Sequence, residues 1–147
     1  MTYRNRMGMA ALSLVGLFVS IYLALHRLGV IGTLACGVDG GCSTVQSSSY
    51  ATFAGVPVPF LGVAGYLVLF VVAFRGISAM GTDRRTSMLL LALSAVAFAF
   101  SLYLTALEAF VIHAWCRWCV VSAIIATLIF VLSLPEAARL RRESIEP

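Results

Sequence analysis

The stretch CRWCVVSAIIATLIFVLSL, residues 116–134, carries the two features that decide the fold. Its length is close to the ~20 residues with which a helix crosses the ~30 Å hydrocarbon core of a bilayer. Two cysteines three positions apart stand at the start of this apolar run. The stretch therefore predicts a membrane-spanning helix with a pair of thiols at one end.

The rest of the chain contains three further apolar runs, at roughly residues 7–26, 56–74 and 88–112. Of the 147 residues, 61% are hydrophobic and 11% are charged, whereas soluble domains carry about 25% charged residues. In lipid the backbone must satisfy its own hydrogen bonds, which favours helices. We predict an all-α integral membrane protein, with a single domain over residues 1–147. It forms a four-transmembrane-helix bundle with an outer, cysteine-containing loop at roughly residues 28–55.

The first apolar run has an alternative interpretation, a cleaved signal peptide, because basic residues precede it and small residues follow it. A signal-peptide core is usually 7–15 residues long, and this run is about 20 residues long. We therefore expect an uncleaved span.

The positive charges predict the orientation of the bundle. The chain has a net charge of +4 and contains arginine but no lysine, and the arginines fall in short clusters between apolar runs. This distribution fits membrane topology better than nucleic-acid binding. With the amino terminus inside, only Arg27 and Arg117 lie outside, so the positive-inside rule places both termini in the cytoplasm. Eight arginines then lie inside: Arg4, Arg6, Arg75, Arg84, Arg85, Arg139, Arg141 and Arg142.

This orientation places all four cysteines of the chain on the outer face of what we expect to be a bacterial cytoplasmic membrane. Cys36 and Cys42 lie in the outer loop, and Cys116 and Cys119 begin the last span. Disulfides persist in such an oxidising compartment. Two close pairs of cysteines on this side therefore indicate disulfide chemistry.

Two less demanding interpretations of the cysteines are a metal site and a pair of structural disulfides. Zinc sites usually separate paired cysteines by two to four residues. Cys36 and Cys42 have five residues between them, which is a poor spacing for zinc. His113 could add a ligand, but the spacing leads us to expect no metal. A structural disulfide across two intervening residues closes a very small ring and gains little entropy.

A redox role explains the pair at residues 116–119 better. Cys116 would lie at a helix N-terminus, where the helix dipole, free N–H groups and the neighbouring Arg117 favour a thiolate. Cys119 would lie one turn deeper, within reach of a ligand inside the bundle. The glycine-rich segment between Cys36 and Cys42 would let that pair move between partners. The pattern predicts thiol exchange near the surface and reaction with a lipid-soluble acceptor below it.

Two longer stretches carry a resemblance to a known family. CGVDGGCSTVQSSSYATFAGVPVPFLGVAGY, residues 36–66, followed by SLYLTALEAFVIHAWCRWCV, residues 101–120, resembles the vitamin K epoxide reductase family in its bacterial form. The resemblance covers roughly residues 10–134. It depends on the order of a loop cysteine pair, a serine-rich segment and a CxxC pair opening the last helix. The quinone-linked oxidase of DsbA has four spans too, but carries its CxxC pair first.

The resemblance implies a thiol:quinone oxidoreductase that supports disulfide bond formation. Cys36 and Cys42 would be the shuttle pair, and Cys116 and Cys119 the active-site pair. Cys119 would face a quinone, either ubiquinone or menaquinone, and reduce it. Cys42 is the favoured partner of Cys116 in the interchange disulfide. Because this chain ends at Pro147, we expect its thioredoxin-fold (DsbA-like) partner to act in trans.

Further residues receive roles in or near the quinone pocket. The resemblance implies that Ser48, or Ser47 in a shifted alignment, belongs to a segment capping the pocket. It also places Ala123 where animal members carry a tyrosine. Ionisable groups inside a membrane are functional candidates. We name His113 as a candidate proton donor and favour a structural role for Glu108.

We expect three aromatic residues to pack or to anchor the chain at the membrane interface rather than to take part in chemistry: Tyr66, Tyr103 and Trp115. Two alternatives to the main function stay open. One is a non-enzymatic membrane subunit whose disulfides lock the outer loop. The other is an enzyme that mainly reduces vitamin K epoxide or quinone.

Overall fold

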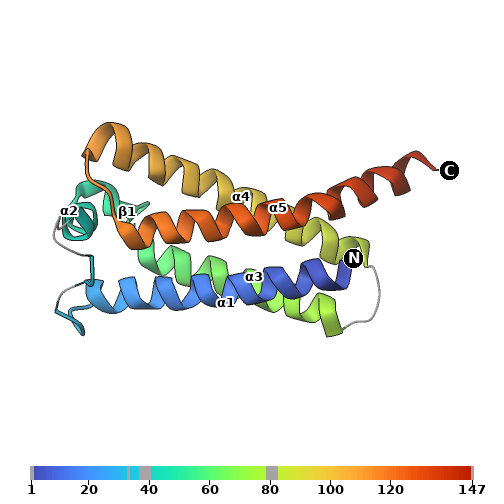
Figure 1. Cartoon of the computed structure of the whole chain (residues 1–147), viewed down its shortest axis with the longest axis horizontal. Helices are drawn as coiled ribbons and strands as arrows, with labels where there is room; N and C mark the ends of the chain where they lie inside the picture. Colours follow the sequence, from blue (N-terminus) through green and yellow to red (C-terminus); the bar gives the residue numbers. More distant parts are fainter. Residues whose placement is uncertain (1, 33, 37–40, 79–82, 147) are drawn as a thin grey trace.

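The computed structural model describes residues 2–32, 34–36, 41–78 and 83–146. Four long helices form a bundle (Figure 1), and all four are apolar and long enough to cross a membrane. This architecture confirms the predicted four-helix membrane fold. The long helices are α1 (Thr2–Arg27), α3 (Val58–Ser78), α4 (Arg84–Leu107) and α5 (Arg117–Ile145), and a π-helical turn, η2 (Glu108–Ile112), directly continues α4.

The helices extend beyond the apolar runs that predict them. Helix α4 begins near the polar residue Asp83, whose side chain accepts a hydrogen bond from the backbone N–H of Arg85 and caps the helix. Helix α5 continues through Pro135, where the apolar run ends, into the polar tail, which is expected to extend the helix into water. Proline removes one helical hydrogen bond. The next residue, Glu136, is held by buried ion pairs that keep this turn in place.

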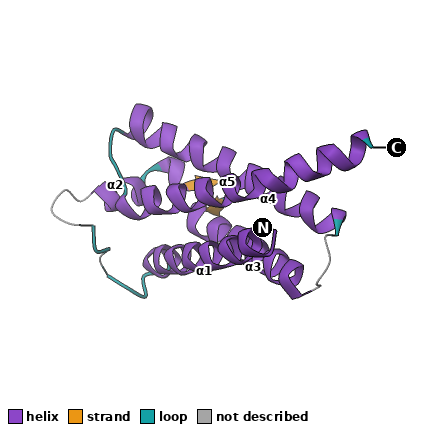
Figure 2. Cartoon of the chain, turned by 45° about the vertical axis from the view of Figure 1, so that its right-hand side comes forward, coloured by secondary structure: helices purple, strands orange, loops and turns teal. Residues whose placement is uncertain are grey.

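The helices pack as two close pairs. Helix α1 lies along α3, and α4 lies along α5, with α5 also contacting α1 (Figures 1 and 2). Small residues allow the close approach of α1 and α3, because a Cβ atom at Gly16 would overlap the ring of Tyr66 and one at Gly62 would crowd Ser20. The core of the bundle includes the fully buried Met9. Its other buried members are Ala10, Val19, Leu23, Tyr66, Leu69, Ala73, Leu90, Ile125 and Ile129.

Short elements cover the end of the bundle opposite to the chain termini (Figure 1). These are α2 (Gly41–Ser47), the 3-10 helix η1 (Ser49–Ala51) and a small antiparallel hairpin of β1 (Thr52–Phe53) and β2 (Val56–Pro57). We call this the cysteine end and the opposite one the termini end. A Cβ atom at Gly41 would overlap the carbonyl oxygen of Trp115, so glycine there lets α2 lie against the start of α5.

A buried cluster of charged and polar groups ties the four long helices together at the termini end. Arg6 of α1 donates to Glu136 Oε1 of α5 over 3.1 Å and to the carbonyl oxygen of Gly76 of α3 over 3.0 Å. Ser87 of α4 donates to Glu136 Oε2 over 2.6 Å, and Arg139 lies 3.4 Å from the same oxygen. We call these five residues the arginine–glutamate cluster.

Candidate functional site

Two free thiols stand at the start of α5. Cys116 is the N-cap residue, and its sulfur accepts a hydrogen bond from the backbone N–H of Cys119 over 3.4 Å. The CxxC spacing thus brings both sulfurs to the first turn of one helix. Cys116 is completely buried and Cys119 partly so.

The surroundings of Cys116 favour its thiolate form. The hydrogen bond from the Cys119 thiol lowers the pKa of Cys116 below the ordinary value, although burial opposes this shift. The backbone N–H groups of Cys119 and Trp118 act in the same downward direction, while the charge of Glu108 opposes it. The net lowering is what a nucleophilic thiol at a helix N-terminus needs.

The other two cysteines form a disulfide beside this pair. Cys36 and Cys42 are bonded to each other, with their Cα atoms 6.0 Å apart. Cys42 lies in the first turn of α2 and is buried in one cluster with Cys116, against which Cys36 and Cys119 also pack. The structure therefore gathers all four cysteines at one end of the bundle. The glycine-rich segment expected to be flexible, residues 37–40, lies outside the described residues.

The chain just before the disulfide is anchored on both sides. The backbone N–H of Ala35 donates to the hydroxyl of Tyr22 over 2.9 Å. The carbonyl oxygen of Ala35 accepts from the indole N–H of Trp118 over 3.2 Å. The rings of Tyr22 and Trp118 also meet edge to face. Cys36 is therefore attached to the bundle through its neighbour, whereas Cys42 belongs to the short helix α2.

A buried carboxyl group touches both free thiol residues. Glu108, only 4% exposed, accepts a hydrogen bond from the backbone N–H of Cys116 over 3.1 Å. Its side chain also forms a hydrogen bond with the thiol of Cys119. The sequence shows Glu108 as an ionisable residue in an apolar run, but its distance from the thiols depends on how η2 turns back toward α5.

A second polar side chain reaches Cys119 from α2. Gln46, 6% exposed, lies with its Nε2 atom 3.7 Å from the Cys119 sulfur. Its backbone carbonyl accepts from Arg27 over 2.9 Å, and its Oε1 atom is buried with no hydrogen-bond partner among the described residues. Sequence reasoning missed Gln46. The available signal was its position four residues after Cys42, which places both on one face of a helix.

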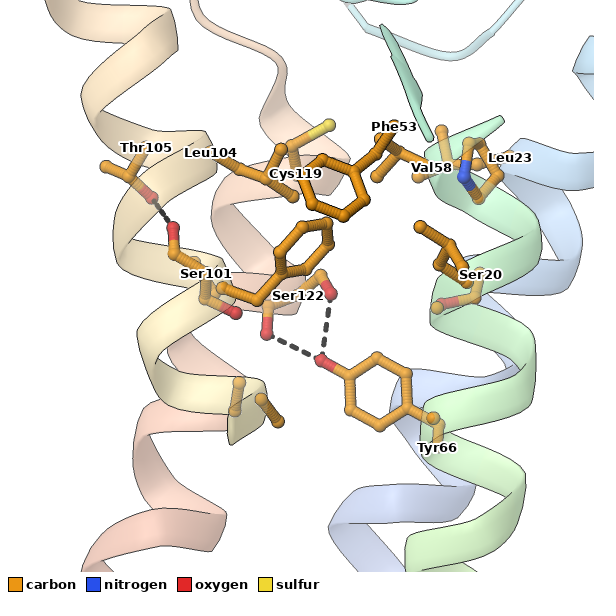
Figure 3. Close-up of a pocket in the computed structure, with 18 of the residues that line it drawn as sticks. Ser20, Leu23, Phe53, Val58, Tyr66, Ser101, Leu104, Thr105, Cys119 and Ser122 are labelled. Carbon is orange, nitrogen blue, oxygen red and sulfur yellow. Dashed lines mark hydrogen bonds between the residues drawn. The ribbon is translucent and has the colours of Figure 1, made fainter. Parts of the chain in front are cut away.

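Cys119 opens onto a cavity of about 350 Å³ inside the bundle (Figure 3). Its lining is mostly apolar and includes the rings of Phe53 and Phe100, which meet edge to face at 5.4 Å. Glu108 and Gln46 line it as well. An apolar cavity of this size with a few polar groups is typical of a site for a small organic ligand.

Residues 7–134 match the sequence model of the vitamin K epoxide reductase family, over most of the chain. The chain belongs to this family. The resemblance seen in the two quoted stretches is thereby confirmed, and the protein is a multi-pass membrane oxidoreductase. Within the described residues, no cluster of three or more histidine, cysteine, aspartate or glutamate side chains offers a metal site.

Of the three residues predicted for the quinone pocket or its proton supply, two line a cavity and one does not. Ala123 lines the large cavity. Ser48 lines a smaller adjoining cavity of about 30 Å³ together with Glu108 and Cys119, and its hydroxyl donates to the carbonyl of Val45 over 2.8 Å. His113, the candidate proton donor, is exposed, has a left-handed backbone conformation and does not line either cavity.

Tyr66 has a polar role in the cavity besides its packing role. Its hydroxyl lies 2.8 Å from both the carbonyl and the hydroxyl oxygen of Ser122, deeper in the bundle than Cys119 (Figure 3). Ser122 precedes Ala123, the position where the resemblance expects a tyrosine in animal members. The cavity thus has polar groups at two depths, one set near the thiols and one at Tyr66.

Proposed function

We propose that this member of the family is a thiol:quinone oxidoreductase that supports disulfide bond formation. The observation that carries the proposal is the different surroundings of two adjacent thiols. Cys119 lines the apolar cavity, whereas Cys116 packs against Cys42 of the disulfide. One pair of cysteines can therefore exchange with a disulfide on one side and react with a cavity ligand on the other.

The electron path begins at a thioredoxin-fold partner on the outer side of the bacterial cytoplasmic membrane. Its two thiols reduce the Cys36–Cys42 disulfide by exchange, and Cys42 then attacks the Cys116–Cys119 disulfide that each turnover regenerates. The anchoring of Ala35 supports Cys42 as the moving member of the shuttle pair. In the free-thiol form described above, the active-site pair has received its electrons and is ready to reduce the quinone.

The acceptor is a quinone, ubiquinone or menaquinone, held in the cavity. The aromatic and aliphatic lining suits a flat ring with an apolar tail, and polar groups at two depths suit two ring carbonyls. A DsbA-type partner is a strong oxidant at about −120 mV, so reoxidising it requires a still stronger acceptor. A respiratory quinone meets this requirement and dissolves in the bilayer.

The test is quinol formation by the purified protein, with a dithiol donor and soluble ubiquinone and menaquinone analogues. Cys119→Ala should abolish quinol formation, because the thiol facing the cavity is gone. In the same variant, the dithiol donor should still reduce the Cys36–Cys42 disulfide by thiol–disulfide exchange.

The matched control is Cys36→Ala with Cys42→Ala. It should lose turnover with a thioredoxin-fold donor and keep quinone reduction once Cys116 and Cys119 have been reduced chemically. Full turnover in Cys119→Ala would refute the proposed path. A wild-type protein that keeps one disulfide pattern and reduces no quinone would favour a structural role for the cysteines.

A further inference from the structure

Glu108 is a buried acid without a cationic partner in the part of the chain that the structure describes. Its exposed fraction is 4%, close to the 3% of Glu136. Glu136 forms ion pairs with Arg6 and Arg139, whereas the contacts of Glu108 are the backbone N–H of Cys116 and the thiol of Cys119. Burying an acid without compensating charge is unfavourable, and such groups inside membranes often serve function.

The local backbone holds Glu108 at this position. It is the first residue of the π-helical turn η2, and its backbone N–H donates to the carbonyls of both Leu104 and Thr105. A π-helical turn is rare and is often found at functional sites. The turn ends at His113, whose left-handed conformation leads the chain back to Cys116. The two helices that meet here therefore place the carboxyl group beside the thiol pair, in the lining of the cavity.

We propose that Glu108 is a catalytic residue that carries the proton of the Cys119 thiol to the quinone. This inference rests on the proposed function. Overall, one S–S bond forms between Cys116 and Cys119, the cysteine pair loses two electrons and two protons, and the quinone gains two electrons and two protons to become the quinol. The Cys116 proton passes to water when its thiolate forms, and water supplies one proton of the quinol. Glu108 takes the other proton from Cys119 and gives it to a quinone oxygen.

The other polar groups near Cys119 are less suited to this role. Gln46 can donate a hydrogen bond to the sulfur but does not take up and release protons in the ordinary pH range. His113 is exposed and lines neither cavity. Tyr66 lies deeper, with its hydroxyl engaged by Ser122. Among the residues that the structure describes, Glu108 is the carboxyl group that both lines the cavity and contacts the thiol pair.

The decisive variant is Glu108→Gln, whose amide oxygen can still accept the Cys116 N–H while the group no longer carries a proton. Chemically reduced protein is mixed rapidly with a quinone analogue, and the rate of quinol formation is followed. We expect a loss of about 10²-fold or more, the usual contribution of general acid–base catalysis. Quinone affinity and the reaction of Cys36–Cys42 with the dithiol donor should each change by less than about twofold, because neither involves proton transfer by Glu108.

Two further variants separate a catalytic from a structural role. Glu108→Asp keeps a carboxyl group and should retain more of the rate than Glu108→Gln. Glu108→Ala opens space beside Cys119, and formate added to this variant should raise its rate. The matched control, Glu136→Gln, makes the same change in the equally buried glutamate of the arginine–glutamate cluster. It should lower thermal stability and keep the rate per folded molecule.

The outcomes distinguish this inference from the proposed function. Wild-type protein that reduces no quinone would overturn both. A wild-type protein that reduces quinone, together with an unimpaired Glu108→Gln, would overturn the role of Glu108 alone. Equal losses of rate and quinone binding in Glu108→Gln and Glu108→Asp, without rescue by formate, would show a structural role and overturn the inference as well.

Discussion

The two ends of the bundle each bury one glutamate, and they use it differently. At the termini end, Glu136 lies among Arg6, Arg139 and Ser87, and its contacts with Arg6 and Ser87 join α5 to α1 and α4. At the cysteine end, Glu108 contacts a backbone N–H and a thiol, and it faces a cavity. Two equally buried acids therefore differ in the charge of their neighbours, and this difference is the basis for expecting different roles.

The comparison predicts that the termini end governs stability. Replacing Arg6 by Met should lower the free energy of unfolding by about 3–5 kcal/mol, because Glu136 loses a fully buried partner. The quinone-reduction rate per folded molecule should stay unchanged. Denaturant titration in detergent micelles and rapid mixing with a quinone analogue measure the two quantities.

The control for this prediction combines Arg6→Met with Glu136→Met. Removing both charges should restore much of the lost stability, since an apolar pair of similar volume can replace a buried ion pair. If Arg6→Met instead slowed quinone reduction and left stability intact, the division of roles between the two ends would be wrong.

A smaller effect is expected at the cysteine end from Gln46→Met. The change keeps the shape of the side chain but removes the donor to the Cys119 sulfur. A hydrogen bond of this kind contributes about 1 kcal/mol. Because it stabilises negative charge on the Cys119 sulfur as the thiol reacts, its loss should slow quinone reduction about fivefold. Stability should not fall, because the buried, unpaired Oε1 atom disappears with the amide. The exposed neighbour Ser47→Ala is the control, and a similar slowing there would point to a general disturbance of α2.

The smallest expected effect is a change in the pKa of Cys116, which depends on its hydrogen bonds at the cysteine end. The Cys119 thiol lowers the pKa of Cys116, so thiolate forms at a lower pH when Cys119 is present. In protein with Cys36→Ser and Cys42→Ser, adding Cys119→Ala should move the thiolate titration of Cys116 to higher pH. Ultraviolet absorbance of the thiolate measures the midpoint. An unchanged or lower midpoint would contradict the contribution assigned to Cys119.

Much of the fold follows directly from the sequence, because lipid permits few structures. Four apolar runs of sufficient length had to become helices, and helix order then placed both cysteine pairs at one end. The limits of the prediction are visible just after Pro135. The polar tail there is helical, as its residues favour, but nothing in the local sequence shows that Glu136 is buried against Arg6, a residue 130 positions away in the chain.

The candidate site is predictable only in part, because several of its contacts join residues that lie far apart in the chain. Cysteine spacing identifies a thiol pair without any knowledge of packing. The contacts of Glu108 and Gln46 with Cys119 require α4, η2, α2 and α5 to meet at one point, and no local pattern encodes that meeting. Sequence names His113 as a candidate proton donor because it is ionisable and lies near the outer end of an apolar run, but its side chain is exposed and its backbone is left-handed.

Helix α2 is only seven residues long, yet it holds both Cys42 and Gln46. A single helical turn separates them, so the two side chains move as one body. Along the proposed path, any displacement of Cys42 toward a partner protein also withdraws the amide from Cys119. On that path α2 would couple the two exchange steps: the amide of Gln46 would be at the Cys119 sulfur only while Cys42 lies beside Cys116.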